Sequence, residues 1–207
     1  MAMLELQSVT CARGGRSLFS GLALKLGAGQ LLRVSGVNGA GKTSLLRLIC
    51  GLLAPLEGAV LWQGQNIAGL REEFNRHLVY LGHAAALKDE LSAIENLQTA
   101  SILGGRSADF AAAMLALDRA GLRGREHVPV RTLSQGQRRR AALARLELCA
   151  QAPLWVLDEP FNALDSHATA WLLGLLERQI GSGGMVVLTS HQPLALPANV
   201  AQQELAL

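Results

Sequence analysis

Apolar residues recur along the chain at two spacings, one typical of strands and one typical of helices. Leucines at every second position, within residues 4–6 and 22–26, predict two half-buried strands that are separated by a turn at 13–17. Short apolar runs predict further strands at residues 30–35, 59–62, 77–81, 154–157 and 185–190. The run at 30–35 leads directly into a glycine-rich loop, and residues 43–50 then show helical spacing that ends at Gly51.

Residues 92–150 form a run of predicted helices with no strand between them. Ser92 and Glu95 form a capping-box pattern, and Ser134 and Gln137 repeat it ahead of a long helix through residue 148. Ser107 is placed to cap a further helix that is rich in Ala and Leu and extends to about residue 120. A last helix is predicted over about 166–180.

This order of elements predicts an α/β fold. Strands that alternate with helices favour a largely parallel sheet, and the uninterrupted helices indicate a helical subdomain inserted into that core. We therefore expect one domain, residues 1–207, with a core of about 1–83 and 151–207 and a helical subdomain of about 84–150.

Composition narrows the class of protein without identifying it. Half of the residues are hydrophobic and only 4% are aromatic, so the core must consist mainly of Leu, Val, Ile and Ala. A net charge of +3 is too small to argue for nucleic acid as a partner. Basic residues gather locally, where the default interpretation is a solvated helix face: these are Arg138, Arg139, Arg140 and Arg145.

The cysteines and the apolar stretches argue against export and against a membrane span. Cys11, Cys50 and Cys149 are odd in number and lack metal-binding spacing, so we expect reduced and mostly buried thiols. Residues 1–9 lack the layout of an export signal. Residues 179–203 carry no charged side chain, but Gly and Pro interrupt them, so we expect membrane contact only through a partner.

The glycine-rich loop carries the clearest chemistry. It fits the P-loop pattern GxxxxGK[ST] between a predicted strand and a predicted helix, which makes a chance glycine turn improbable. Its backbone N–H groups would surround phosphate oxygens at a helix N-terminus, with Lys42 on the β- and γ-phosphates and the Thr43 hydroxyl on Mg²⁺. The candidate nucleotide-binding residues are Gly36, Val37, Asn38, Gly39, Ala40, Gly41, Lys42, Thr43 and Ser44.

An acidic pair follows the apolar run at 154–157. In open α/β sheets ligands collect at the carboxyl ends of strands, where Asp158 would join the Mg²⁺ shell and Glu159 would polarise an attacking water. Taken alone, the pair could equally be a solvated turn after a strand. The P-loop upstream favours the catalytic interpretation.

The segment LSQGQ, residues 133–137, contains no nucleophile, acid or metal ligand. Ser134 as a cap, Gly136 for close approach and unpaired N–H donors describe a helix N-terminus that could hold an anion. No partner for that anion is near in the sequence, and the alternative is simply a well-capped helix.

These segments together resemble the ABC ATPase family over the whole chain. LSQGQ resembles its LSGGQ signature, with Gln135 for the usual Gly, and Ser134 precedes Asp158 by 24 residues as in the family. Asp165 in ALD matches the D-loop, and His191 matches the switch histidine.

The resemblance implies a fold, two cofactors and a partner. The fold is a P-loop NTPase core with an antiparallel β subdomain and an inserted α-helical subdomain, and the cofactors are ATP and Mg²⁺. Two copies would pair head to tail, so that the signature of one chain (Ser134, Gln135, Gly136 and Gln137) meets the ATP of the other. The amides of Ser134 and Gly136 would then clamp the γ-phosphate with Lys42, Glu159 would orient or deprotonate the water, and His191 would contact the γ-phosphate.

Two positions depart from the family pattern. Arg13 stands where most members have an aromatic residue that stacks on adenine, so either its guanidinium plane stacks there or it is merely exposed. His83 stands at the Q-loop position in place of glutamine. Imidazole is a poor Mg²⁺ ligand, so we expect His83 to hydrogen-bond water or phosphate, or to serve a partner contact.

The stretches CARGGRSLF, LWQGQ, YLGH, LSQGQRRRAALARL and LDEPFNALD resemble one subgroup, the ATP-binding subunit of bacterial cytochrome c maturation, the CcmA type. That resemblance implies CcmB- and CcmC-type membrane subunits at the cytoplasmic face of the inner membrane, with no nucleic acid. Whether haem itself is transported stays open. The alternatives are another small-substrate ABC exporter or a soluble ABC ATPase acting on nucleic acid or ribosomes, although only 92 residues separate Lys42 from Ser134 and leave no room for a coiled coil.

Overall fold

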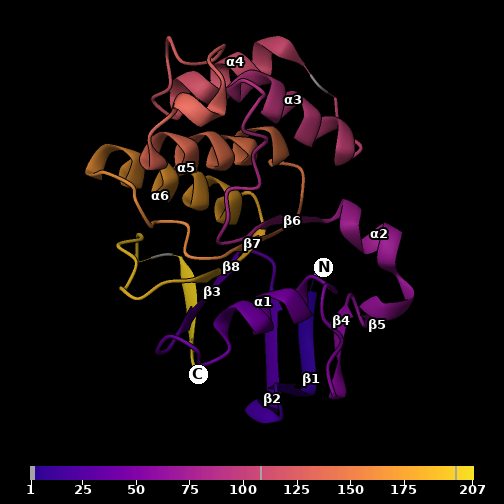
Figure 1. Cartoon of the computed structure of the whole chain (residues 1–207). Coiled ribbons are helices and arrows are strands. Elements are labelled where there is room, and N and C mark those ends of the chain that lie inside the picture. Colours follow the sequence, from indigo (N-terminus) through magenta and orange to yellow (C-terminus); the bar gives the residue numbers. More distant parts are fainter. Residues whose placement is uncertain (1–2, 108, 199) are drawn as a thin grey trace. The chain divides into compact units, whose positions relative to one another are not determined.

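A computed structural model describes residues 3–107, 109–198 and 200–207 and divides the chain into two compact units (Figure 1). The first, here the sheet unit, comprises Met1–Tyr80, Ala152–Glu159 and Glu177–Leu207. The second, here the helical unit, comprises Leu81–Gln151 and Pro160–Leu176. The expected helical subdomain of about 84–150 therefore gains the segment from Pro160 to Leu176, which follows the acidic pair.

The sheet unit begins with an antiparallel sheet in the order β2-β1-β4-β5. β1 (Met3–Arg13) and β2 (Arg16–Gly27) form the predicted hairpin around Gly14 and Gly15, whose positive φ values suit its turn. The register pairs Leu4 with Leu26 and Leu6 with Leu24, which places these leucines on one face. β4 (Glu57–Trp62) pairs with the other edge of β1, and β5 (Gln65–Asn66) extends the sheet.

The second sheet of this unit has the order β6-β7-β8-β3-β9, in which the early strand β3 pairs with the last strand of the chain, β9, yellow in Figure 1. Its strands are β3 (Gln30–Ser35), β6 (Leu78–Leu81), β7 (Leu154–Leu157), β8 (Met185–Thr189) and β9 (Ala201–Ala206). The pairs β3·β8, β3·β9 and β7·β8 are parallel, which agrees with the prediction of a largely parallel sheet. Every residue of β7 and β8 is buried, which explains why both strands are continuous apolar runs.

Besides the 3₁₀ turn at Ile67–Gly69, two strands and one α-helix of the sheet unit were not predicted, because their sequences carry little apolar pattern. β9 is an edge strand whose residues alternate between exposed and half-buried, with the polar sequence AQQELA. The two residues of β5 are too few to show a period. α2 (Arg71–Arg76) has one buried apolar side chain, Phe74, which packs on Trp62 with ring centroids 5.6 Å apart.

The helical unit has its own apolar core. α3 (Ala93–Leu103), α4 (Phe110–Arg119) and α5 (Gln135–Ala144) surround it, with α6 (Ser166–Gly181) beginning in the same unit. Short 3₁₀ turns at Val130–Thr132 and Arg145–Cys149 flank α5. Small residues dominate this core, which allows the helices to pack closely: Ala93, Ile94, Leu97, Ala113, Ala116, Leu117, Ala120, Leu122, Ala141 and Ala144.

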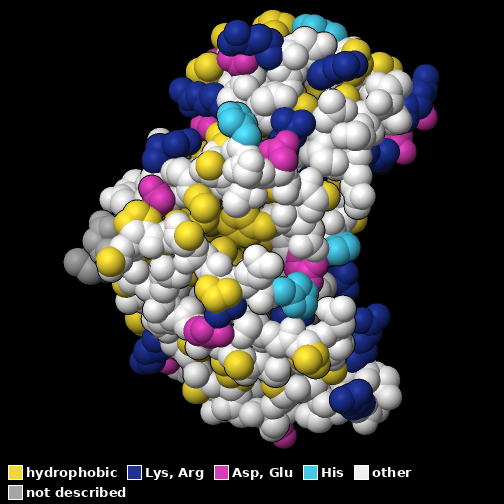
Figure 2. Space-filling model, turned by 90° about the vertical axis from the view of Figure 1, so that its left-hand side faces the viewer, with side chains coloured by type: hydrophobic (Ala, Val, Ile, Leu, Met, Phe, Trp, Pro, Cys, Tyr) yellow, Lys and Arg dark blue, Asp and Glu magenta, His cyan; other side chains and the backbone are white. Residues whose placement is uncertain are grey.

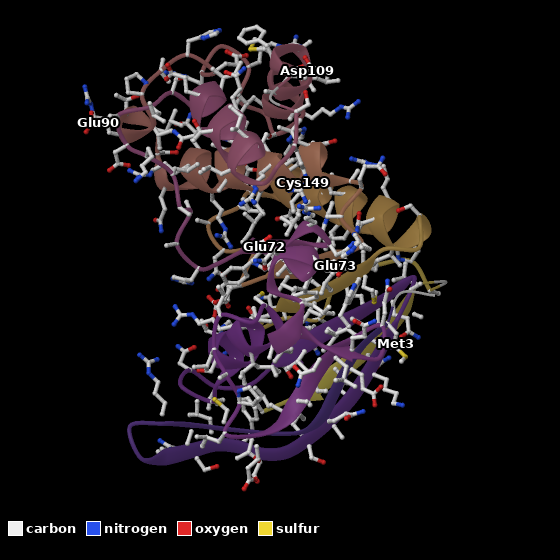
Figure 3. All side chains as sticks on the ribbon, turned by 90° about the vertical axis from the view of Figure 1, so that its right-hand side faces the viewer. Met3, Glu72, Glu73, Glu90, Asp109 and Cys149 are labelled. Atoms are coloured by element: carbon white, nitrogen blue, oxygen red, sulfur yellow. The ribbon has the colours of Figure 1, made fainter. Side chains whose placement is uncertain are left out.

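The predicted helix ends of this unit are partly confirmed. Both capping boxes are present, at Ser92–Glu95 and at Ser134–Gln137. The prediction that Ser107 caps α4 is wrong, because the cap is Asp109, whose Oδ1 accepts a hydrogen bond from the amide of Ala111 at 3.1 Å (Figure 3). The helix predicted through residue 148 ends as an α-helix at Ala144 and continues as a 3₁₀ turn to Cys149.

The three cysteines are free and buried, as predicted. Burial raises the pKa of each thiol, most strongly that of Cys50 in the core of the sheet unit. A buried protonated thiol is a poor nucleophile, so these residues act as small apolar core residues.

Candidate functional site

The loop between β3 and α1 (Lys42–Ile49) has a backbone that only glycine adopts readily. The φ angles of Gly36, Gly39 and Gly41 are +145°, +86° and +111°, in the region that disfavours residues with a Cβ. A Cβ on Gly36 would also lie 2.7 Å from the carbonyl oxygen of Leu207. Gly41 is the N-cap of α1 and provides no side-chain hydrogen bond, which suits a helix N-terminus that receives an anion.

Lys42 is folded back over this loop. Its side chain is buried, and Nζ donates to the carbonyl oxygens of Gly36 at 2.7 Å and of Val37 at 3.3 Å. Carbonyl oxygens accept hydrogen bonds but carry no full negative charge. A phosphate in the loop would supply that charge, which is the role expected of Lys42.

The acidic strand end lies next to the loop. Thr43 Oγ1 donates to Asp158 Oδ2 at 2.8 Å, so the two expected magnesium ligands are in direct contact. The other carboxylate oxygen, Oδ1, accepts from Thr189 Oγ1 at 2.8 Å. Only 2% of Asp158 is exposed, and both of its oxygens are held in place by these hydroxyl groups.

Glu159 adopts an unusual backbone conformation. Its φ of +48° is in the left-handed region, where a non-glycine residue is held at a cost in free energy. The amide of Glu159 donates to Thr189 Oγ1 at 2.6 Å, which helps to hold that conformation. Oε1 of Glu159 lies 3.2 Å from His191 Nε2, so the structure brings the expected base and the switch histidine together.

Two neighbours of this group were not identified from the sequence. Thr189 binds both acidic residues, and its only sequence signal is that it is the first polar residue after the apolar run of β8. Tyr80 on β6 is half-buried, and burial together with the nearby charge of Asp158 raises the pKa of its hydroxyl group.

Lys42, Thr43 and Glu159 are among the residues that line a pocket of about 260 Å³. It is lined by Arg13, Leu18, Asn38, Gly39, Gly41, Lys42, Thr43, Ser44 and Glu159, all of the sheet unit. Arg13 thus lines the same pocket as the P-loop, its stacking on adenine stays a prediction, and Leu18 adds an apolar surface that the sequence analysis missed. The signal for Leu18 was an apolar residue directly after the hairpin turn.

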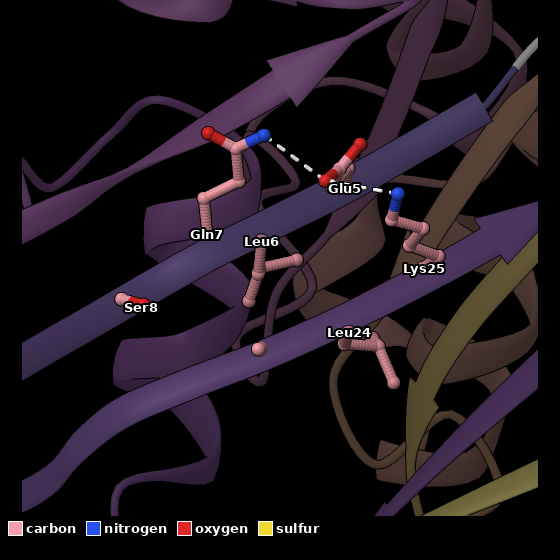
Figure 4. A pocket seen from close by; sticks show the side chains of 7 residues that line it. Glu5, Leu6, Gln7, Ser8, Leu24 and Lys25 are labelled. Atoms are coloured by element: carbon pink, nitrogen blue, oxygen red, sulfur yellow. Dashed lines mark hydrogen bonds and ion pairs between the residues drawn. The ribbon is translucent and has the colours of Figure 1, made fainter.

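A second hollow of the sheet unit, of about 420 Å³, lies on β1 and β2 and is a weaker candidate (Figure 4). Glu5 Oε1 accepts from Gln7 Nε2 at 3.0 Å and lies 3.3 Å from Lys25 Nζ. The hydrogen bond from Gln7 and then the contact with Lys25 lower the pKa of Glu5. Glu5, Gln7 and Lys25 of this hollow thus already bind one another.

The segment 133–137 begins α5 in the helical unit. Ser134 Oγ accepts from the amide of Gln137 at 3.2 Å, and Gln137 Oε1 accepts from the amide of Ser134 at 2.9 Å. The Ser134 amide, which we expected to bind phosphate, therefore donates to Gln137 in this structure. Of the first helical amides, those of Gln135 and Gly136 are the ones that this capping box leaves for an anion.

Comparison with known proteins agrees with this geometry. A family model described as ABC transporter matches residues 19–162. A curated protein of Nitrosospira multiformis is 49% identical over all 207 residues and the whole of both chains, and its name is cytochrome c biogenesis ATP-binding export protein CcmA. Proteins of the same name from Methylococcus capsulatus and Escherichia coli are 52% and 45% identical, over 93% and 99% of this chain and 93% and 95% of their own.

The chain belongs to the ABC transporter ATP-binding family, in the CcmA group.

Solved structures agree on the fold. An ABC transporter ATP-binding protein from Pyrococcus furiosus superposes with a TM-score of 0.82 at 23% identity, over 98% of this chain and 96% of that one. A second structure, of the ATP-binding subunit of an ABC transporter, also has a TM-score of 0.82, at 26% identity over 91% of this chain and 79% of that one. The predicted fold class is therefore confirmed.

The residues of the P-loop and of the acidic strand end fit ATP and a magnesium ion. Lys42 offers a cation and the glycine loop offers backbone amides, while Thr43 and Asp158 offer the oxygen ligands that Mg²⁺ prefers. Among the described residues no group of three or more His, Cys, Asp or Glu could hold a metal ion. Thr43 and Asp158 are only two ligands, so an ion here would share its coordination between the protein, the phosphates and water.

The D-loop packs on the signature within the helical unit. A Cβ on Gly136 would lie 2.9 Å from the carbonyl oxygen of Ala163, and Ala163 itself has a φ of +60°. Asp165 Oδ1 accepts from the amide of Ala168 at 2.8 Å and so caps the first turn of α6. The signature glycine is thus required by a neighbouring backbone of the same chain.

Gly136→Ala should therefore disturb the signature and the D-loop together. We expect a loss of about 1–3 kcal/mol of stability from overpacking, with a fall in ATP hydrolysis larger than the change in the unfolded fraction explains. Urea unfolding and steady-state hydrolysis measure the two effects. Gly181→Ala is the matched control, since a Cβ there meets nothing within 4 Å, and a wild-type hydrolysis rate in Gly136→Ala would contradict the prediction.

His83 belongs to the helical unit, and its side chain is exposed. Its carbonyl oxygen accepts from Arg139 Nη1 at 3.3 Å. The contact therefore involves the backbone at the Q-loop position, which is the same for histidine and for glutamine. The role of the imidazole stays a prediction.

The expectation of a solvated arginine face is wrong for Arg139, which is only 8% exposed. Its neighbours on α5 have other partners. Arg138 forms an ion pair with Asp89, and Arg140 Nη1 donates to the carbonyl oxygens of Ala120 and Gly121, at the end of α4. On the face shown in Figure 2 the Lys and Arg side chains are dispersed, and several of them lie beside Asp or Glu.

Proposed function

We propose that this chain is the ATP-hydrolysing subunit of a bacterial inner-membrane ABC complex for c-type cytochrome biogenesis. The observation that carries the proposal is the convergence of Lys42, Thr43, Asp158, Glu159 and His191 on one pocket region in a member of the CcmA group. A residue of suitable chemical type is present there for each step of ATP hydrolysis.

Each of these residues has its own role in the proposed hydrolysis of ATP. With nucleotide bound, Lys42 would turn from the loop carbonyls to the phosphates, and Thr43 and Asp158 would hold the magnesium ion. Bound magnesium supplies positive charge to the phosphate oxygens. His191 holds Oε1 of Glu159, which fixes the carboxylate that orients the attacking water or takes its proton.

Two copies would complete the site. The pocket of about 260 Å³ is smaller than the range of about 300–1,000 Å³ that is typical of small-molecule pockets. A head-to-tail dimer would place the Gln135 and Gly136 amides of one copy on the γ-phosphate bound to the other. Closure and reopening of the dimer would then drive haem export or the release of haem to its chaperone.

Among the described helices, none is long and apolar enough to cross a membrane. We propose CcmB- and CcmC-type subunits as partners, with this chain peripheral on the cytoplasmic face of the inner membrane. The names of the relatives, which call them export proteins, support this assignment.

Affinity capture of the tagged chain from bacterial membranes tests the proposal. We expect membrane proteins of the CcmB and CcmC type to co-purify, and we expect loss of the chain to abolish holocytochrome c formation. Expression of the wild-type chain should restore it, whereas Glu159→Gln should capture the same partners without restoring it. Capture of ribosomes instead, or normal cytochrome c maturation without the chain, would contradict the assignment.

A further inference from the structure

Arg139 is a buried arginine in the middle of a run of three. It follows the signature by two residues on α5, and 8% of it is exposed. A guanidinium stays charged at all physiological pH values, and a charge out of contact with water must be held by good hydrogen bonds. The groups that accept those bonds therefore indicate what the side chain does.

Backbone carbonyl oxygens of two segments accept these bonds. Arg139 Nη1 donates to Gly82 O at 3.2 Å and to His83 O at 3.3 Å, and Nε donates to Pro160 O at 3.4 Å. All four residues belong to the helical unit. A planar guanidinium with donors on several edges can reach both segments at once, which an ammonium group cannot do in the same geometry.

Both segments lie where the chain enters the helical unit. The chain leaves the sheet unit after Tyr80 and again after Glu159. Gly82 and His83 follow the first crossing, and Pro160 follows the second directly. Pro160 is bonded to the expected catalytic base, and its ring restricts φ at this point of the chain.

We propose that Arg139 is a positioning residue that ties the Q-loop segment and the chain following Glu159 to the signature helix. Movement of α5 when the signature binds a phosphate is thereby transmitted to His83 and to the backbone that carries Glu159. Because the contact uses carbonyl oxygens, it does not depend on which side chain stands at position 83. The inference rests on the function proposed above for Glu159 and the signature.

Arg139→Gln and Arg139→Lys test the proposal in steady-state hydrolysis by the full-length chain. Arg139 does not line the nucleotide pocket, so KM for ATP should stay within about twofold, whereas kcat should fall about tenfold in Arg139→Gln because the base is misplaced. Arg139→Lys keeps the positive charge but loses the planar guanidinium with donors on several edges, so it should show an intermediate kcat. Arg138→Gln is the matched control, since it removes the same charge from the same helix and should leave kcat within about twofold.

Hydrogen exchange provides a second readout that does not require activity. In Arg139→Gln the amides of residues 82–88 and 160–165 should exchange faster than in the wild type, whereas Arg138→Gln should leave both segments unchanged. Wild-type kcat and exchange in folded Arg139→Gln would overturn the proposal. Failure of both Arg139 variants to fold would overturn it as well, because a residue needed only for folding is not a positioning residue.

Failure of the proposed function would look different. If the wild-type chain did not hydrolyse ATP, or if Glu159→Gln hydrolysed it at the wild-type rate, the assignment of the base would fail before Arg139 was considered. If both behave as expected and only Arg139→Gln resembles the wild type, the inference on Arg139 alone is wrong.

Discussion

Glu159→Gln should nearly abolish ATP hydrolysis while leaving ATP binding intact. General-base catalysis contributes about 10²–10⁴-fold to rate, and an amide cannot accept the proton of the attacking water. The substitution keeps the size of the side chain, and its Oε1 can still accept from His191, which lies 3.2 Å from that atom in the wild type. The amide contact with Thr189 involves the backbone and is retained.

A second consequence of Glu159→Gln concerns assembly. With ATP bound and not consumed, the proposed head-to-tail dimer should persist and elute as a dimer in size-exclusion chromatography with ATP and Mg²⁺. The same variant without nucleotide should elute like the wild type. Turnover at the wild-type rate would show that Glu159 is not the base, and a monomer with ATP bound would contradict the proposed dimer.

Asp158→Asn should lower ATP hydrolysis without lowering the stability of the chain. In the wild type a carboxylate with 2% exposure ends a fully buried strand, and it is held there by the hydroxyl groups of Thr43 and Thr189. Burying a charge is costly even when it is hydrogen-bonded, and functional sites commonly retain such costs. The neutral amide should leave the thermal midpoint of the nucleotide-free chain unchanged or raised, while weaker magnesium binding lowers hydrolysis by about 100-fold.

Thermal unfolding without nucleotide and hydrolysis over a series of magnesium concentrations measure the two effects of Asp158→Asn. Thr189→Ser is the control, because it keeps the hydroxyl group that binds Asp158 and should retain most of the activity. A marked drop in the thermal midpoint of Asp158→Asn would show that the carboxylate is needed for folding. Full activity at ordinary magnesium concentrations would exclude Asp158 from the metal site.

The strands and helices that the sequence predicted are those in which the apolar residues occupy the buried positions. β7 and β8 are buried on both sides and read as unbroken apolar runs, while the leucines of β1 and β2 alternate because one face is covered. The edge strand β9 and the short helix α2 were not predicted because few of their side chains enter a core. The Ser107 cap failed because Asp109, two residues later, makes the same local hydrogen bond at the true start of α4.

The chemistry near the P-loop was largely local and therefore predictable. Positions 36–43 form a continuous motif, and an acidic pair after a buried strand reaches the sheet edge where that motif lies. Thr189 and Leu18 were missed because neither residue type identifies a site until the fold brings it to the pocket or to the acidic pair.

By itself, the sequence determined which residues are candidates for binding phosphate, metal and water, because those abilities belong to side chains and to short backbone motifs. The tertiary structure decided how three consecutive arginines are used. Arg138 pairs with Asp89, Arg139 is buried on the carbonyl oxygens of Gly82, His83 and Pro160, and Arg140 reaches the end of α4. A helix turns by about 100° per residue, so identical neighbours face different surroundings, and only the packed chain shows what those surroundings are.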